Sequence, residues 1–441
     1  MKRTRVKIVA VHENPNTPCW PCIDHDHTKE LNRILQVVYA KNPQMDFDLT
    51  EVTELSQVQQ TYEEDVKTYD GVLVLLMTCW KNVDTFYAMQ SAKGLPTVIA
   101  DVPYCGSGST LIRASELIRK EHLQAVLLST LDYTQIADAV RLFDVIAKMK
   151  QTRILDITGR PERNRNDYEK FHRDWGCTFV QKSGEDLMEQ ILRVSDQDAA
   201  DVAARWKAAA DEVVEPSEQD LLDAAKMHLA LKEMMRQTET DAVTLDCLNI
   251  SYGDGYRGKK MYPCLSHYEM LCHGTVAVCE SDLNATVTSL VIRYLTDKPG
   301  FVSDPVIDTS SDQIIYAHCV ACPKVYGFDD PRTCRFSIRS HAEDKKGASV
   351  QVYFPANEKV TTLIIYPTES APSVIHSGRS VGNVGFQEAC RSKLAAETNA
   401  EAILNNWSGG WHRVTVFGDY RKTLRRLFRM KGISYIEEDK D

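Results

Sequence analysis

The sequence predicts an α/β protein with two Rossmann-like, doubly wound domains followed by a β-rich C-terminal domain. Strand patterns alternate with helix patterns up to about residue 305, and short alternating strands follow. Alternating strands and helices are typical of parallel sheets that helices cover on both faces. A chain of 441 residues also exceeds one comfortable hydrophobic core. We therefore expect domains at residues 1–150, 151–305 and 306–441.

The first domain is predicted from buried apolar runs separated by helical spacing. Val6–Val11, Gly71–Met77 and Pro96–Ala100 have the composition of buried strands. A helix is expected from about residue 28 to 40, and a second from 131 to 150 closes the domain. This order predicts the first doubly wound sheet.

The second domain repeats the pattern, and the third changes it. Arg153–Thr158 begins a new strand, a long helical region covers 185–237, and Asp241–Leu245 resumes the sheet. Ala348–Tyr353 and Val360–Ile365 then alternate apolar and polar residues, as strands with one buried face do. These strands predict the β-rich third domain.

Charge and hydropathy exclude two classes of partner. The formal net charge is −10 and the pI is near 5.7, so we expect no general nucleic-acid binder, which needs a basic face. The longest apolar run, Val72–Met77, is too short to span a bilayer, so we expect no membrane partner.

The cysteine count and the N-terminus indicate a cytoplasmic protein. Thirteen cysteines, an odd number scattered through a long chain, are typical of reduced thiols. The first apolar stretch ends at His12 and Glu13, so we expect no signal peptide.

Two carboxylates, Glu280 and Asp304, follow short apolar runs. Thr275–Cys279 is predicted as a strand, a helix begins near Asp282, and Gly300–Val302 is predicted as a second strand. A strand, a helix and a strand of this length predict a parallel crossover unit, in which both strands end at one edge of a sheet. We therefore expect the two carboxylates to meet at that edge.

Two histidines complete a predicted metal site. His318 ends the run Gln313–Ala317, and His412 precedes Val414–Phe417. Two carboxylates with one or two imidazoles favour a divalent ion of intermediate hardness, such as Mn²⁺, over thiolate-bound structural zinc. Carboxylates at strand ends also serve as helix caps, and that alternative stays open.

Four further residues are candidates for substrate binding. Trp80 and Trp411 are either core aromatics or apolar walls for a sugar face. Arg339 and His341 belong to a stretch of mixed charge, which is either a surface loop or a source of hydroxyl and anion binders facing the carboxylates.

A different chemistry is suggested near the N-terminus. Cys19 and Cys22 have the spacing of a dithiol redox motif, and with His25 and His27 they also suggest a zinc site. A solvated loop before the first helix is the competing interpretation.

Five stretches stand out together in the second and third predicted domains: Gly274–Asp282, Tyr294–Thr296, Ser303–Pro305, Tyr316–Cys319 and Gly410–Arg413. Together they resemble the L-fucose isomerase and L-arabinose isomerase superfamily. The spacing of the carboxylates, 304 − 280 = 24 residues, is similar to the fucose isomerase pattern. His318 is similar to an additional metal histidine of arabinose isomerases, so the chain resembles a divergent, shorter fucose isomerase-like branch.

The resemblance implies a site and a reaction. Its metal ligands would be Glu280, Asp304 and His412, with His318 as a fourth, and they would hold Mn²⁺, or else Co²⁺ or Mg²⁺. The reaction would interconvert an aldose and its ketose through a cis-enediol, with the two carboxylates as an unassigned acid and base pair. Trp80 is similar to a substrate-lining tryptophan of the family.

The resemblance also implies a homo-trimer or homo-hexamer, in which the N-terminal domain of one subunit lines the pocket of another. The expected small-molecule partner is an aldose or ketose whose identity stays open. The alternative function is a non-catalytic sugar-binding or sugar-sensing protein of the same fold.

Overall fold

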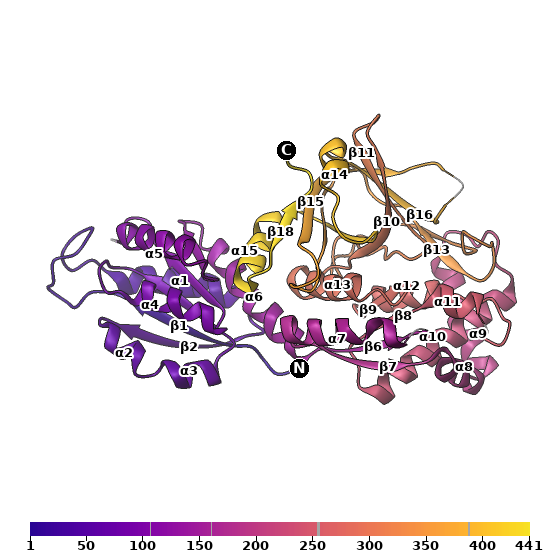
Figure 1. The fold of residues 1–441 in the computed structure, drawn as a ribbon, viewed down its shortest axis with the longest axis horizontal. Helices are drawn as coiled ribbons and strands as arrows, with labels where there is room; N and C mark the ends of the chain where they lie inside the picture. Colours follow the sequence, from indigo (N-terminus) through magenta and orange to yellow (C-terminus); the bar gives the residue numbers. More distant parts are fainter. Residues whose placement is uncertain (106, 160, 254–255, 387–388) are drawn as a thin grey trace. The chain divides into compact units, whose positions relative to one another are not determined.

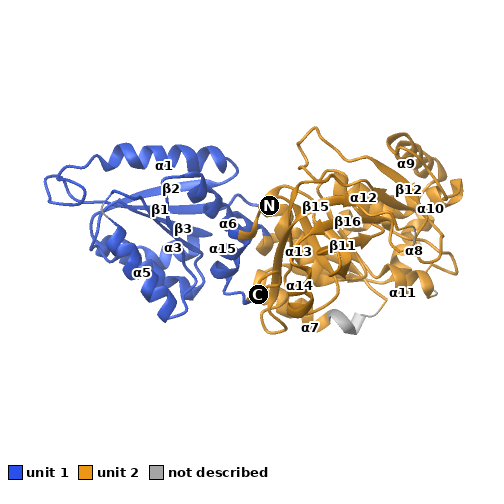
Figure 2. Cartoon of the chain, turned by 90° about the horizontal axis from the view of Figure 1, so that it is seen from above, with its two compact units in different colours: residues 1–148, 422–434 blue, residues 149–421, 435–441 orange. Residues whose placement is uncertain are grey.

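The chain divides into two compact units (Figure 2). Unit 1 holds residues 1–148 and 422–434, and unit 2 holds residues 149–421 and 435–441. The predicted division of residues 151–441 into two domains stays a prediction. The structure is a computed structural model that describes residues 1–105, 107–159, 161–253, 256–386 and 389–441.

Unit 1 is built on a five-stranded parallel sheet with the order β2-β1-β3-β4-β5. All six residues of β3 are buried, as its apolar sequence predicts. The order is that of a doubly wound sheet, which places ligand sites where the order reverses, beside β1 and β3. The strands are β1 (Arg5–Val11), β2 (Asp46–Val52), β3 (Gly71–Leu76), β4 (Thr97–Asp101) and β5 (Val126–Ser129).

Helices connect these strands (Figure 1). Among the described residues of the chain, none of the helices is long and apolar enough to cross a membrane. The helices that lie wholly or mostly in unit 1 are α1 (His27–Lys41), α2 (Leu55–Gln59), α3 (Tyr62–Thr68), α4 (Val83–Gln90), η1 (Ser91–Lys93), α5 (Gly108–Lys120), α6 (Thr134–Gln151) and α15 (Arg421–Lys431).

Unit 2 begins with a four-stranded parallel sheet of order β7-β6-β8-β9. Serine side chains cap the first turns of α8, α9 and α10, as helix starts require. The strands are β6 (Arg153–Ile157), β7 (Thr178–Lys182), β8 (Ala242–Leu245) and β9 (Val276–Cys279). The helices are α7 (Pro161–Trp175), α8 (Gly184–Arg193), α9 (Asp196–Ala209), α10 (Glu218–Thr238), α11 (Cys247–Tyr252), α12 (Cys264–Cys272) and α13 (Leu283–Thr296).

The rest of unit 2 is β-rich, and the mixed α/β class with a β-rich C-terminal region is confirmed. A seven-stranded sheet has the order β14-β17-β10-β11-β16-β15-β18, and an extra β14–β15 pairing closes six of its strands into a ring. The elements are β10 (Phe301–Asp308), β11 (Gln313–His318), β12 (Phe336–Arg339), β13 (Ser349–Val352), β14 (Lys359–Ile364), β15 (Ser373–Asn383), β16 (Ser392–Glu397), α14 (Ala400–Asn406), β17 (Arg413–Phe417) and β18 (Tyr435–Glu437).

The predicted parallel crossover unit is wrong. β9 belongs to the four-stranded sheet, whereas β10 pairs antiparallel with β11 and β17 in the other sheet. Helix α13 contacts strands of both sheets and lies between them (Figure 1). Asp304 also lies within β10 rather than after it. The two carboxylates therefore approach each other across two sheets, not along one edge.

A buried ion pair fixes β17 to the residue that follows β18. The guanidinium of Arg413 donates to Glu438 at 2.6 Å and 3.3 Å, and both side chains are fully buried. His376 Nδ1 lies 2.9 Å from the same carboxylate. Although burial raises the pKa of Glu438, hydrogen bonds from His376 and Arg413 outweigh it and hold that pKa below its usual value.

We expect Glu438→Ala to destabilise the chain by about 3–5 kcal/mol, because it leaves the Arg413 charge buried without its partner. Urea unfolding followed by circular dichroism measures the change. Glu401→Ala, at an exposed position in the first turn of α14, is the control and should stay within about 0.5 kcal/mol. A loss at Glu438 no larger than the control would contradict the role given to the pair.

Candidate metal centre

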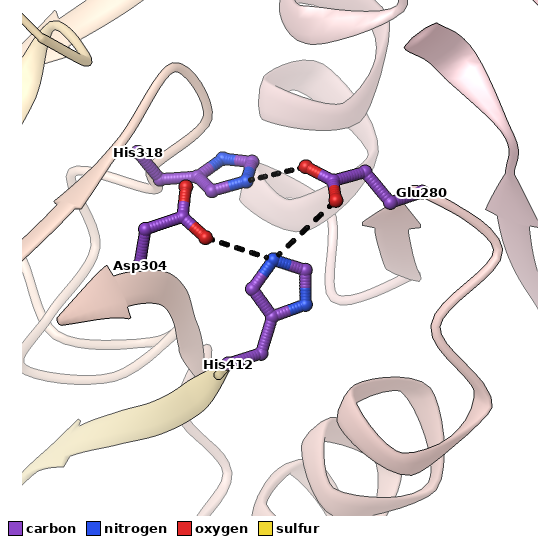
Figure 3. Close-up of side chains that lie close together, drawn as sticks. All are labelled: Glu280, Asp304, His318 and His412. Carbon is purple, nitrogen blue, oxygen red and sulfur yellow. Dashed lines mark ion pairs between the residues drawn. The ribbon is translucent and has the colours of Figure 1, made fainter. Parts of the chain in front are cut away.

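Four side chains of unit 2 converge: Glu280, Asp304, His318 and His412 (Figure 3). Their ligand atoms all lie within 4.8 Å of one another. His412 Nε2 is 3.1 Å from Asp304 Oδ1 and 3.8 Å from Glu280 Oε2. His318 Nε2 is 4.0 Å from Glu280 Oε1. The structure thus brings together the four residues that the sequence proposed as ligands.

The seven-stranded and four-stranded sheets of unit 2 contribute unequally to this group. Asp304 lies on β10, His318 ends β11 and His412 immediately precedes β17. These three strands are neighbours, because β10 pairs with both β11 and β17. Glu280 comes from the other sheet, directly after β9. The ring of six strands, called the barrel below, therefore supplies three side chains, and the parallel sheet supplies one.

The spacing of the donor atoms suits a divalent cation. Metal–ligand bonds of roughly 2.1 Å in an octahedron place neighbouring ligand atoms about 3.0 Å apart and opposite ones about 4.2 Å apart. The distances of 3.1 and 3.8 Å around His412 Nε2 fall in this range. Two carboxylates with an imidazole also match an ion of intermediate hardness. The residues present therefore fit the predicted metal.

The backbone at Glu280 is held in a rare conformation. Glu280 and the next residue, Ser281, have φ values of 66° and 52°, in the left-handed region. Such residues cost of the order of 1–3 kcal/mol each and persist only when neighbouring contacts fix them. Ser281 donates a hydrogen bond to the buried carboxylate of Asp156 on β6, which also accepts one from Tyr168. This turn aims Glu280 toward the barrel.

Asp282 orients His412. The Nδ1–H of His412 donates to Asp282 Oδ2 at 2.7 Å, so the Nε2 atom faces Asp304 and Glu280. The other oxygen of Asp282 accepts from the Ala285 amide and caps α13. A carboxylate behind a histidine is the usual support of a metal-binding imidazole. Sequence reasoning took Asp282 only as a helix start; its position two residues after Glu280 was the available signal.

His318 has the opposite hydrogen-bonding pattern. The Val320 amide donates to His318 Nδ1 at 3.2 Å. Burial lowers the pKa of His318 to about 4, so the ring is neutral at pH 7. A neutral imidazole that accepts at Nδ1 carries its proton on Nε2. His318 therefore presents an N–H donor toward Glu280.

The charges in the group are coupled. Burial raises the pKa of Glu280, and the charges of Asp304 and Asp282 add to that rise. Although burial alone would raise the pKa of Asp304, the hydrogen bond from His412 and the nearby imidazoles lower it. Burial disfavours protonated His412, but Asp282 and Asp304 outweigh it and raise its pKa well above the usual value. An incoming cation has to displace that proton.

A cavity of about 470 Å³ borders the group. Glu280, Asp282 and His412 line one part of it, and Trp411 lines another. The Trp411 side chain is 62% exposed, and its indole N–H donates to the Pro305 carbonyl at 3.0 Å. A flat aromatic surface beside carboxylates suits a small molecule that carries both apolar faces and hydroxyls.

The other substrate-binding candidates lie outside the group of four. Arg339 donates to Glu215 at 2.8 Å and 3.0 Å and to Gln351 at 2.7 Å, so its guanidinium already has partners. His341 is buried and stacks on Tyr262 with ring centres 4.0 Å apart. Their binding of substrate stays a prediction.

Three candidates of the sequence lie in unit 1. Trp80 is 64% exposed and has the guanidinium of Arg113 over its ring, 5.8 Å from the centre. Cys19 and Cys22 are free thiols. A redox role for the two cysteines and a substrate role for Trp80 stay predictions.

Comparison with known proteins finds a distant similarity to a sugar isomerase. No family model matches the chain. Sulfoquinovose isomerases from Priestia aryabhattai and from Priestia megaterium are each 21% identical to it over 214 residues, which cover 47% of this chain and 46% of each relative. The chain thus spans about half the length of the curated relatives it matches. This similarity supports a distant relationship to a sugar isomerase and leaves the narrower fucose or arabinose isomerase assignment as a proposal.

Two solved structures were also compared. The XylFII molecule is 10% identical, with 68% of this chain and 96% of that chain covered and a TM-score of 0.19. A periplasmic solute-binding protein of an ABC transporter from Actinobacillus succinogenes 130z, with bound D-allose, is 13% identical, with 67% and 92% covered and the same TM-score of 0.19. At this TM-score, neither likeness carries an argument.

We expect Asp282→Asn to weaken metal binding by about 10–100-fold, because the amide keeps an oxygen to cap α13 but removes the carboxylate behind His412. Isothermal titration of metal-stripped protein with Mn²⁺ measures the affinity. Asp308→Asn, on β10 but outside the group, is the matched control and should bind as the wild type does. Equal affinities in the two variants would show that Asp282 does not support the site.

Proposed function

We propose that the protein is a cytoplasmic, metal-dependent aldose–ketose isomerase, an intramolecular oxidoreductase of the L-fucose and L-arabinose isomerase type. The observation that carries this proposal is the convergence of Glu280, Asp304 and His412, with Asp282 behind the histidine. The distant similarity to sulfoquinovose isomerase supports the class of reaction.

Glu280, Asp304 and His412 are the proposed metal ligands, and Mn²⁺ is the proposed ion, with Co²⁺ and Mg²⁺ as alternatives. When bound, the ion polarises the sugar carbonyl and stabilises the negative charge that develops on its oxygen. His318 was also predicted as a ligand. Because its Nε2 carries a proton, we propose that His318 is instead a hydrogen-bond donor, either to Glu280 or to a sugar oxygen that occupies the same position.

The two carboxylates divide the proton transfers. One proton leaves C2 of the aldose and returns to C1, and the hydroxyl proton of O2 moves to O1, with a cis-enediol between the two states. Glu280 and Asp304 are the proposed pair, one for the carbon proton and the other for the oxygen proton, with the assignment between them left open.

Substrate contacts complete the proposal. The exposed face of Trp411 provides an apolar wall for the sugar beside Glu280. Arg339 and His341 are proposed to bind hydroxyls, although Arg339 would have to exchange its contact with Glu215. We also propose a homo-trimer or homo-hexamer in which the exposed Trp80 reaches the pocket of a neighbouring subunit.

We expect Glu280→Gln and Asp304→Asn to lower kcat by about 10²–10⁴-fold while the fold is retained, because each removes one proton-transfer group. Ketose formation is followed in deuterated water with Mn²⁺ and a panel of L-fucose, D-arabinose, L-arabinose, L-rhamnose, D-altrose and sulfoquinovose. Deuterium in the product reports proton exchange at the enediol.

The control for this assay is Asp308→Asn, which should turn over as the wild type does. Wild-type rates in both Glu280→Gln and Asp304→Asn would contradict the mechanism. A tight sugar complex of the wild type that yields no ketose would instead identify a non-catalytic sugar-binding protein.

We expect His318→Ala to lower kcat by about 10²–10³-fold through the loss of one hydrogen-bond donor, with the content of bound metal unchanged. His318→Gln keeps an N–H near the same position and should recover part of the rate. Metal analysis of both purified variants decides the role. Loss of the ion from both would identify His318 as a ligand.

A further inference from the structure

Unit 1 contains a separate group of metal-binding side chains that the proposed reaction does not use. It consists of His12, His27 and Glu51, whose ligand atoms lie within 4.8 Å of one another. His12 follows β1, His27 begins α1 and Glu51 lies on β2, so three elements meet there. We propose that this group binds a borderline divalent transition-metal ion, of which Zn²⁺ is the representative.

The two imidazoles face one carboxylate without bonding to it. His12 Nε2 is 3.4 Å and His27 Nε2 is 3.8 Å from the same oxygen, Oε2 of Glu51. Both distances exceed the 2.7–3.2 Å or so of a good N–H···O hydrogen bond. The rings are nearly parallel, at 9°, with centres 3.9 Å apart. The Nε2 atoms of both histidines therefore face the same Glu51 oxygen across a gap, without a hydrogen bond to it.

The tautomer of His12 leaves a lone pair in that gap. Its Nδ1 lies 3.0 Å from the Glu13 carbonyl oxygen. Since a carbonyl only accepts hydrogen bonds, Nδ1 is the donor, and in the tautomer with its one proton there the Nε2 lone pair points to the Glu51 carboxylate. Two acceptors facing each other repel unless a proton or a metal cation lies between them. A backbone carbonyl on the other nitrogen is also a common support of metal-bound histidine.

The gap has the size of a tetrahedral metal site. Zinc bonds to nitrogen and oxygen of roughly 2.0–2.1 Å place two ligand atoms of a tetrahedron about 3.3–3.4 Å apart. The separation of His12 Nε2 and Glu51 Oε2 is 3.4 Å, whereas His27 has to move by a few tenths of an ångström and to turn its ring out of the 9° stack on His12, since a metal bond lies in the plane of the imidazole. Two histidines and one carboxylate form a known zinc ligand set that leaves a fourth position for water.

The site would fix the segment between His12 and His27. This segment lines a cavity of about 270 Å³ together with Met77, the residue after β3. The cavity lies where the strand order reverses, beside β1 and β3. Glu13 is not a competing ligand, because it pairs with Lys81 at 2.9 Å. An ion held by His12, His27 and Glu51 would tie both ends of this segment to β2 and shape the cavity wall.

The donor set differs from the zinc site considered from the sequence. That hypothesis joined His25 and His27 to Cys19 and Cys22, whereas among the described residues His27 groups with His12 and Glu51. His25 Nε2 instead lies 3.4 Å from Cys105 Sγ. The expected ligands are therefore nitrogen and oxygen atoms, without sulfur.

The test is Co²⁺ and Zn²⁺ binding to the metal-stripped full chain that carries Asp304→Asn and His412→Gln, which disable the group in unit 2. We expect this chain to bind one ion and to show the strong visible absorption of four-coordinate Co²⁺. Adding His12→Gln or His27→Gln should weaken the binding at least about 10-fold, because loss of even a contact that only supports a ligand weakens metal binding by about that factor. His122→Gln, at an exposed histidine of unit 1, is the matched control.

Two results would overturn the proposal. One is that the parent chain binds no ion. The other is that His122→Gln weakens binding as much as His27→Gln does. Thermal unfolding without metal shows whether each variant folds, and Glu51→Gln, at a side chain that is 45% exposed, gives the same readout if a histidine variant does not fold. Because the parent chain lacks the unit 2 group, its result is independent of the isomerase proposal.

Discussion

The hydrogen bond between Asp282 and His412 joins the two halves of unit 2. Asp282 caps the helix that follows the parallel sheet, and His412 precedes a strand of the barrel. A hydrogen bond between charged groups contributes about 1.5–3 kcal/mol and also fixes direction. Because Asp282 orients His412 toward Glu280 and Asp304, the donor set depends on the packing of two sheets rather than on either one.

The fold was largely predictable because the spacing of apolar residues, which distinguishes helices from strands, can be read within each short segment. The alternation of strand and helix in unit 1 and the short strands after residue 306 are both found in the structure. The error at β10 arose from assuming that two strands joined by one helix share a sheet. Its burial alternates along Phe301–Asp308, as is typical of an antiparallel strand with one exposed face, but the sequence hides this alternation because Ser303 is buried and Val306 is exposed.

The candidate ligands of the site could be predicted from the sequence, but the hydrogen bonds that orient them could not. Glu280, Asp304, His318 and His412 were visible because each adjoins or lies in an apolar run that places it near a strand end. The hydrogen bonds that distinguish the two histidines were not visible. That of His412 joins residues 130 apart in sequence, and that of His318 depends on the local turn at Val320. The grouping of His27 with His12 and Glu51 likewise depends on strand pairing that no local pattern reveals.

The late position of Arg413 and Glu438 in the sequence affects when the candidate metal centre can form during protein synthesis. Glu280, Asp304 and His318 leave the ribosome well before His412, and the carboxylate that anchors the residue next to His412 follows later still. Since the parts of a chain fold as they emerge, the parallel sheet can form while the ligand set is still incomplete. A nascent chain at that stage holds two carboxylates without the imidazole that separates their charges. The four side chains therefore come together only after His412 has emerged, and on the proposed function the ion would be loaded after most of the chain has been made.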